Sequence, residues 1–166
     1  SFTAIYLIAA YHIQSQNLLK LENIHSNTLR YQDAYEKGTF FQMVVTPEEY
    51  SEAFGVIVDE QDQTVFDSSF GILVKEWVNQ AIEQTNGRNE GQIVLEGRRF
   101  LFSRAPAYAK VDSSLQNAAV EQFNQIAFLD VTASMRSLQE LLMAFAGVGV
   151  LTLLAMLGIS ILFAKR

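Results

Sequence analysis

The stretch "FLDVTASMRSLQELLMAFAGVGVLTLLAMLGISILFAKR", residues 128–166, joins two kinds of sequence and decides how the chain is organised. It begins like a buried strand, passes through Asp130-Val131-Thr132 and enters a run at residues 141–164 that has no charged side chain. A bilayer core takes roughly 20 apolar residues as a helix, and core helices of soluble domains rarely reach that length without a polar face. The sequence therefore predicts a transmembrane helix over residues 141–164.

Both ends of the chain agree with a membrane protein. Lys165 and Arg166 follow the apolar run, and by the positive-inside pattern residues 165–166 begin a cytoplasmic part. Residues 1–13, SFTAIYLIAAYHI, carry no charge, are too short to cross a bilayer alone and lack the basic start of a signal peptide. We expect them to be the outer end of a truncated first membrane helix, with a buried N-terminal helix as the alternative. The expected location is the cell membrane, multi-pass, with residues 14–140 as an extracytoplasmic domain.

The composition of the body between the apolar ends excludes several classes of function. All acidic residues lie between Glu22 and Glu140, and the chain carries a net charge of −6, or −8 without Lys165 and Arg166. A surface that binds phosphates needs a basic patch, so we expect no nucleic-acid partner. The chain has no cysteine, which excludes disulfides and thiolate metal sites. Roughly a hundred residues suit a single small core.

Residues 14–35 contain neither Gly nor Pro and are predicted to form a long helix. A narrow stripe recurs along it at alternating steps of three and four. Its members are Leu21, Ile24, Thr28, Tyr31 and Tyr35. This spacing is typical of a seam between two helices. Packing on the domain's own sheet is the other interpretation, and both can hold along different parts of one long helix.

The rest of the body predicts short strands in hairpins, separated by helices. A capping box at residues 46–49 starts a short helix through about Ala53. Strands are expected at residues 54–58, 63–67, 92–96, 99–107 and 122–131, with a turn at Gly97-Arg98 and a loop near residues 110–117. A helix after the first hairpin has Phe70, Leu73, Val74, Trp77 and Ala81 on one face and stops at Asn86-Gly87. The fold class is therefore α+β, an antiparallel sheet of about five strands with helices against it.

The strand–turn–strand "FGVIVDEQDQTVFDSS" at residues 54–69, the three later strands and the closing "LDVT" resemble an extracytoplasmic PAS-like sensor domain of the single Cache or PDC type. The order of membrane helix, long helix, sensor domain and membrane helix ending in "FAKR" is similar to that of membrane-bound sensor histidine kinases of Gram-positive bacteria. The resemblance implies a HAMP linker and a kinase core after Arg166, a homodimer, and a downstream response regulator.

Asp130 and Thr132 are the candidate signalling joint. They end the last strand and precede the exit helix, where a carboxylate or hydroxyl can accept a hydrogen bond from the first backbone N–H groups. No Gly or Pro interrupts residues 133–140, so a continuous helix can carry motion towards the membrane. The alternative is an ordinary N-terminal cap without a signalling role.

No catalytic constellation is evident in this chain, and we expect neither a cofactor nor a metal. His25 is interpreted as a solvated or seam position on the long helix rather than a general base. Glu48 and Glu49 belong to a helix start, and the acidic residues of the 59–62 turn lack the full signature of a Ca²⁺ loop. Any enzymatic activity is expected in the full-length parent, which the resemblance makes a protein histidine kinase.

A small-molecule site is predicted from the strand that starts at Arg99. Even-numbered residues of this strand share a face, which puts the guanidinium of Arg104 beside Phe100 and Phe102. Such a group can hold a small anion in an apolar pocket. The resemblance to PAS-like sensors implies a small-molecule site between sheet and helices, to which Phe66 and Trp77 could also contribute. The alternative is that the aromatic side chains are ordinary core and that Arg104 extends its head into water. Arg98 and Arg99 are expected to be exposed at the turn.

Together these observations predict a signal-input module, which the resemblance makes the input region of a membrane-bound two-component sensor histidine kinase. An external stimulus, such as a small-molecule or anionic ligand, would alter the packing of the body and act through the lipid-embedded helices on the kinase core. The same body is compatible with the sensor region of a chemoreceptor or of a cyclic-dinucleotide enzyme. A membrane-anchored adaptor that binds another protein is the alternative from a different class.

Overall fold

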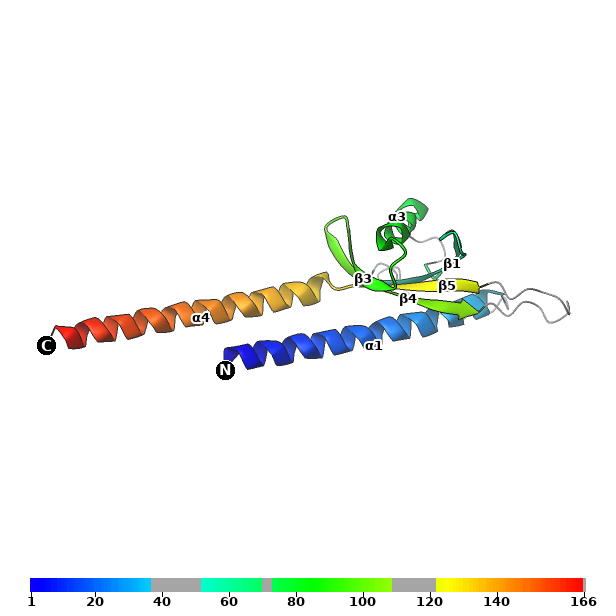
Figure 1. The fold of residues 1–166 in the computed structure, drawn as a ribbon. Helices are drawn as coiled ribbons and strands as arrows, with labels where there is room; N and C mark the ends of the chain where they lie inside the picture. Colours follow the sequence, from blue (N-terminus) through cyan, green and yellow to red (C-terminus); the bar gives the residue numbers. More distant parts are fainter. Residues whose placement is uncertain (37–51, 70–72, 109–121, 166) are drawn as a thin grey trace. The chain divides into compact units, whose positions relative to one another are not determined.

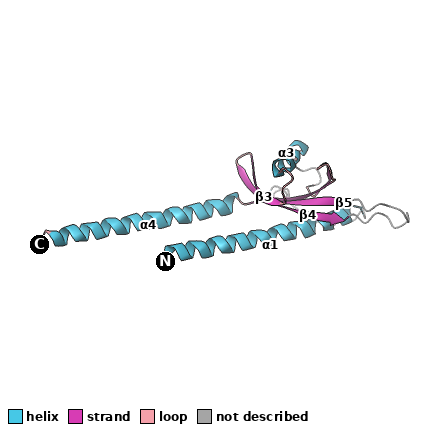
Figure 2. Cartoon of the chain, viewed as in Figure 1, coloured by secondary structure: helices cyan, strands magenta, loops and turns pink. Residues whose placement is uncertain are grey.

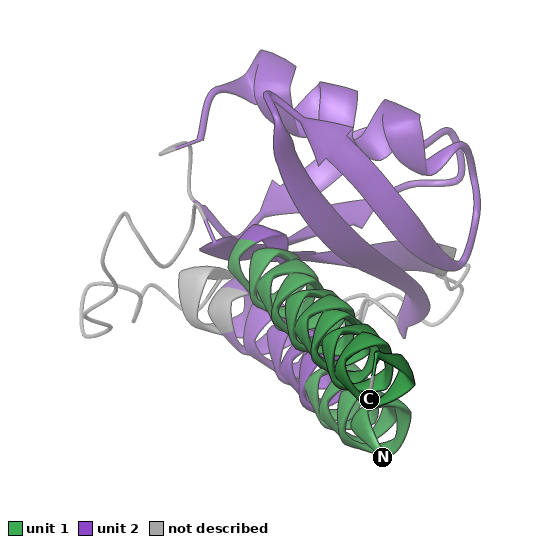
Figure 3. Cartoon of the chain, turned by 90° about the vertical axis from the view of Figure 1, so that its left-hand side faces the viewer, with its two compact units in different colours: residues 1–15, 133–166 green, residues 16–132 purple. Residues whose placement is uncertain are grey.

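A computed structural model describes residues 1–36, 52–69, 73–108 and 122–165. The chain divides into two compact units, one made of Ser1–Ser15 with Ala133–Arg166 and the other of Gln16–Thr132 (Figure 3). The predicted short helix at residues 46–53 and the loop at 110–117 lie mostly or wholly outside the described residues. The second unit spans Gln16–Thr132, and the body predicted from the sequence spans residues 14–140.

The body is built on a five-stranded antiparallel sheet (Figure 1, Figure 2). Its strands are β1 (Ala53–Val58), β2 (Thr64–Asp67), β3 (Glu90–Leu95), β4 (Arg98–Tyr108) and β5 (Gln122–Asp130). They are hydrogen-bonded in the order β2-β1-β5-β4-β3, so the last strand of the sequence is the central strand of the sheet. This arrangement confirms the α+β class and the two expected hairpins, and it places the end of β5 between β1 and β4.

One face of the sheet carries the main hydrophobic core, because alternate residues of each strand point to the same side. Phe128 of β5 stacks on its cross-strand neighbour Phe54 with ring centroids 4.8 Å apart, and Phe102 flanks it on β4 at 6.3 Å. Helix α3 (Lys75–Thr85) covers this face with Val78, Ala81 and Ile82. The core therefore lies between α3 and the even-numbered residues of the three central strands.

Helix α3 starts later than its apolar pattern predicts. Leu73 and Val74 precede the first turn, and Val74 is an exposed N-cap residue with extended backbone, φ −63° and ψ 132°. Leu73 still packs against the core without being helical. The predicted stop is confirmed: Asn86 adopts the left-handed conformation, φ 49°, and its N–H donates a hydrogen bond to the Glu83 carbonyl.

Helix α1 (Phe2–Glu36) contributes its second half to the body. The stripe members Leu21, Ile24 and Thr28 are buried within a single chain. Thr28 lies directly on Gly55 of β1, on the face opposite α3, and a Cβ added to Gly55 would stand 1.9 Å from the Thr28 hydroxyl oxygen. For this part of the stripe, packing on the domain's own sheet is therefore the correct interpretation.

Helix α4 (Thr132–Ala164) contains the apolar run and has a mean hydropathy of 2.3 in its most apolar window. Its side chains are largely exposed, and among the described residues it is the one helix long and apolar enough to cross a membrane. Within the first unit the ring of Phe2 packs against that of Phe145, with centroids 5.1 Å apart. The start of α1 thus accompanies the apolar part of α4, whereas a second complete span is not seen in the described residues.

Candidate functional site

The sheet ends at a hydrogen-bonded junction that holds the first residue of α4. Oδ1 of Asp130 accepts a hydrogen bond from the Thr132 backbone N–H at 2.9 Å and another from the Thr132 hydroxyl at 2.6 Å. Oδ2 accepts two more from the guanidinium of Arg98, at 2.9 Å from Nε and 2.6 Å from Nη2. The cap expected for the exit helix is therefore present, and one carboxylate supplies it.

The backbone of β4 is tied to the same point. The Thr132 hydroxyl oxygen accepts a hydrogen bond from the N–H of Arg99 at 2.9 Å. The N–H of Val131, a fully buried residue, donates to the Arg99 carbonyl at 2.8 Å. The pairing of β4 with β5 consequently continues past the end of β5 to Thr132, the first residue of α4.

The hydrogen bonds at the junction lower the pKa of Asp130. Burial alone raises the pKa of this carboxyl, but hydrogen bonds from the Thr132 hydroxyl and backbone N–H and the charge of Arg98 outweigh that effect. Asp130 is therefore ionised at neutral pH, which is the state in which its two oxygens can accept all four hydrogen bonds.

Arg98 is the junction residue that the sequence analysis misplaced. It was expected to be exposed in a turn at Gly97-Arg98, whereas the turn consists of Glu96 and Gly97 and Arg98 is the first residue of β4. Its guanidinium is partly buried, pairs with Asp130 and lies over the ring of Phe100 at 5.3 Å from the centroid. Both turn residues have positive φ, 49° and 78°, as a two-residue hairpin turn requires.

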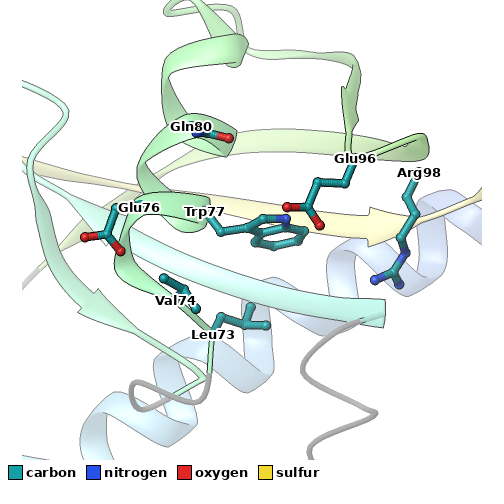
Figure 4. A pocket seen from close by; sticks show the side chains of 7 residues that line it. All are labelled: Leu73, Val74, Glu76, Trp77, Gln80, Glu96 and Arg98. Atoms are coloured by element: carbon teal, nitrogen blue, oxygen red, sulfur yellow. The ribbon is translucent and has the colours of Figure 1, made fainter.

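A pocket of about 430 Å³ opens beside this junction, between the sheet and the start of α3 (Figure 4). Its lining consists of Leu73, Val74, Glu76, Trp77, Gln80, Glu96 and Arg98. Trp77 forms its wall and rests edge-to-face on Phe100, with ring centroids 5.5 Å apart. Arg98 therefore belongs both to the pocket lining and to the junction.

The residues predicted to form an anion site are only partly brought together. Phe100 and Phe102 share the α3 face, as expected, but both are fully buried in the core. Trp77 contacts Phe100 from α3, while Phe66 of β2 pairs with Ile57 and so lies on the opposite face of the sheet. Phe66 is thus separated by the sheet from the other four residues.

Arg104 is neither in a ligand pocket with these aromatic rings nor extended into water. Its side chain is 9 % exposed, and its guanidinium donates to the two carboxylate oxygens of Asp62 at 2.7 and 3.2 Å and to the Thr85 hydroxyl at 3.3 Å. Asp62 comes from the hairpin turn of β1 and β2 and Thr85 from the end of α3. The anion that binds Arg104 is therefore the carboxylate of Asp62. Through these contacts Arg104 connects β4 with the β1–β2 turn and the end of α3.

Removing the charge of Asp62 should destabilise the body through Arg104. Asp62→Asn keeps a residue that tolerates the positive φ of 57° but leaves a buried guanidinium without its counter-ion. We expect a loss of about 1–2 kcal/mol in the free energy of unfolding, less than for a fully buried pair because Asp62 is 36 % exposed. Denaturant unfolding followed by the fluorescence of Trp77, the one tryptophan of the chain, measures it.

The matched control for this substitution is Glu60→Gln in the same turn, where the side chain is exposed. It should leave the unfolding free energy unchanged within error. Arg104→Met in the Asp62→Asn background should recover part of the loss, because it removes the unpaired charge. Equal stability of wild type and Asp62→Asn would show that the pair contributes nothing.

Two further polar residues considered in the sequence analysis are Asp59 in the acidic turn and His25 on the long helix. Asp59 accepts hydrogen bonds from the N–H groups of Gln61 and Gln63, both at 2.9 Å, as expected for a structural turn. Both ring nitrogens of His25 are buried without a hydrogen-bond partner among the described residues, and burial lowers its pKa. Of the two positions expected for His25, the solvated one is therefore wrong, and the seam position stays a prediction. Groups of three or more metal-ligating side chains are absent from the described segments.

The junction could not be assembled from the sequence because its two halves are 32 residues apart. One feature of the sequence could have indicated this ion pair: Arg98 and Arg99 directly follow Gly97 at the start of one strand, and Asp130 ends another strand. When compared with protein-family models, curated proteins and solved structures, the chain shows no significant match to any of them.

Proposed function

We propose that this chain is the signal-input region of a membrane-bound two-component sensor histidine kinase. In this proposal the body Gln16–Thr132 is an extracytoplasmic PAS-like domain, and the apolar parts of α1 and α4 lie in the membrane. The observation that carries it is the junction: the central strand of the sheet passes within one residue into a 33-residue helix whose apolar part is exposed. A structural anchor needs no such set of side-chain hydrogen bonds where its domain joins its membrane helix.

The PAS-like assignment is supported by the architecture expected from the resemblance. The first hairpin, the intervening helix and three further antiparallel strands are all present, and a long N-terminal helix packs on the sheet. The closing Asp130-Val131-Thr132 sits where the sheet ends and α4 begins. These features support the fold-level part of the proposal, and the kinase output comes from the resemblance alone.

The proposed mechanism is a change of packing between the sheet and its helices. A stimulus that favours one arrangement of the body would move β4 and β5 relative to their surroundings by the 1–2 Å typical of packed elements. Because Asp130, Thr132 and Arg99 connect both strands to the first turn of α4, the helix would follow this movement. The stimulus must prefer one of the two arrangements, since equal affinity for both would shift nothing.

The proposed topology can be tested because the natural chain has no cysteine. A single cysteine at Gln61, in the exposed β1–β2 turn, should react with a membrane-impermeant maleimide in intact cells. A single cysteine at Lys165, after α4, should react only once the cells are permeabilised. The expected contrast follows from a body outside the membrane and a C-terminal end inside it.

Two outcomes of the labelling would contradict the proposal. Equal labelling of both positions in intact cells would show that α4 does not separate them, and recovery of the protein in the soluble fraction would remove the membrane helix altogether. The gene sequence after Arg166 then distinguishes the outputs. A HAMP-like pair of helices followed by a phospho-accepting histidine box indicates a kinase, and a long coiled coil indicates a chemoreceptor.

A further inference from the structure

The pocket beside Trp77 has a lining whose charge and shape favour one class of ligand. Two carboxylates, Glu76 and Glu96, belong to its lining; in Figure 4 they lie on opposite sides of the Trp77 indole, that of Glu96 beside the ring and that of Glu76 pointing away from it. Its only lining cation among the described residues is Arg98, whose charge is neutralised by Asp130 at 2.6 Å. The free charge facing an occupant is therefore negative.

The start of α3 does not reverse this preference. The first turn of a helix carries a partial positive charge of roughly half an electron, which on its own attracts anions. Glu76 lies in that first turn and compensates it. An anionic ligand would also have to approach Glu96, so repulsion from two full charges exceeds the attraction of the helix end.

An indole face flanked by carboxylates is a setting in which organic cations bind. A cation within about 6 Å of a tryptophan ring is attracted by its quadrupole, and tryptophan is the strongest of the aromatic residues in this respect. Leu73 and Val74 add apolar surface for the body of such a ligand, and 430 Å³ suits a molecule of modest size. The lining thus offers each element of an ammonium-binding site: an aromatic wall, counter-charges and an apolar floor.

The backbone conformation of Glu96 is unusual for a glutamate, which is a second observation about this lining residue. Glu96 has φ 49° in a two-residue hairpin turn, where Asn, Asp or Gly is favoured and a glutamate is uncommon. The residue holds a long carboxylate over the pocket at a conformational cost that Asn would largely avoid. The strained residue is thus one of those that line the pocket, and the site is argued from the lining and not from the strain alone.

We propose that this pocket binds a small organic cation of the alkylammonium class, with its charged nitrogen at Trp77 and beside Glu96, and with Glu76 adding a further negative charge to the lining. The inference that binding is also sensed rests on the proposed function. Arg98 lines the pocket and holds Asp130, so an occupant that contacts the Arg98 side chain can displace it and alter the junction at the start of α4. The ligand site and the signal output would in that case share one side chain.

The test uses the full chain in lipid nanodiscs and the fluorescence of Trp77, which is the chain's single tryptophan. Three probes of nearly equal shape differ in charge: choline, the neutral 3,3-dimethylbutan-1-ol and the anion 3,3-dimethylbutyrate. We expect choline to change the emission saturably, with at least tenfold tighter binding than either isostere. A response that is equal for the three probes, tighter for the anion, or absent for choline overturns the proposal.

Variants locate the site without disturbing the core. Glu76→Gln with Glu96→Gln removes both exposed carboxylates and should weaken choline binding roughly tenfold, because each partly solvated charge contributes only a few-fold. Glu83→Gln, on an exposed position of the same helix outside this pocket, should bind choline as wild type does. Equal loss in Glu83→Gln would show a non-specific charge effect and reject the site. Because binding is measured on the isolated chain, its failure leaves the proposed topology and sensor role standing, and failure of the labelling experiment leaves the site standing.

Discussion

Gly55→Ala should destabilise the body by about 3 kcal/mol, because a single methyl group at this position enters space occupied by α1. The added Cβ would stand 1.9 Å from the Thr28 hydroxyl oxygen and 2.9 Å from Thr28 Cβ, well inside van der Waals contact. The strand cannot easily move aside, since the Gly55 N–H donates to the Ser68 hydroxyl and its carbonyl accepts from the Ser68 N–H, both at 2.9 Å. The absence of a side chain at Gly55 is what allows the long helix to lie on β1.

Unfolding of the chain in detergent micelles, followed by Trp77 emission, measures this effect on the body. Gly147→Ala is the matched control, because a Cβ at Gly147 in α4 meets nothing within 4 Å. Thr28→Gly in the Gly55→Ala background removes both clashing atoms and should recover about 2 kcal/mol, after the cost of roughly 1 kcal/mol for a helical glycine. Wild-type stability in Gly55→Ala alone would mean that α1 does not pack on β1 in this way.

Asp130→Ala should cost about 2 kcal/mol, because it removes the acceptor of four hydrogen bonds and with it the ion pair between Asp130 and Arg98. The figure is below that of a fully buried pair because the Arg98 side chain is 37 % exposed. Asp130→Asn should lose about half as much, since its amide oxygen can still accept from the Thr132 N–H. The same unfolding assay in micelles applies, and Asp130→Ala as stable as wild type would contradict the junction.

The contribution of Asp130 should also depend on pH in a defined direction. Its pKa is lower in the folded protein than in the unfolded chain, so its stabilising effect is complete above the unfolded pKa of about 4 and is lost as the pH falls through the folded value. The difference in unfolding free energy between wild type and Asp130→Asn should therefore be constant from about pH 5 to 7 and shrink below about pH 4. A difference that grows on acidification would reverse the sign and exclude a depressed pKa.

The junction connects this stability measurement to the proposed signalling role. In the intact protein, Asp130→Ala combined with Thr132→Gly should abolish the response to stimulus at normal protein levels, because both substitutions remove the side-chain hydrogen bonds that tie β4 and β5 to the first turn of α4. A normal response would remove the junction from the mechanism while leaving its contribution to stability intact.

Sequence periodicity predicted the elements because it reflects local geometry. The five strands, the α+β class, the long first helix and the left-handed stop at Asn86 follow from alternation, helical spacing and turn chemistry within short windows. The errors are also local in origin. The start of α3 and the turn at residues 96–97 were each displaced by one to a few residues, since apolar residues before a helix and charged residues after a turn fit either assignment.

The candidate site was predicted only where one residue's role depends on its immediate neighbours. Asp130 capping Thr132 is an interaction between residues two positions apart, and it was expected. Arg98 was assigned to solvent because its partner Asp130 lies 32 residues further along the chain. Arg104 was assigned to a ligand or to water because Asp62 and Thr85 come from two other segments.

By itself, the sequence determined which segments are helix or strand and which helix is apolar enough for a bilayer, because backbone period and side-chain polarity are properties of consecutive residues. Only the tertiary structure decided that the stripe on α1 covers Gly55, that Phe66 lies on the other face of the sheet, and that Arg98 joins a pocket to the start of α4. Those facts depend on how strands β1, β4 and β5 align in space. That alignment is decided by packing of the whole core, and no local pattern encodes it.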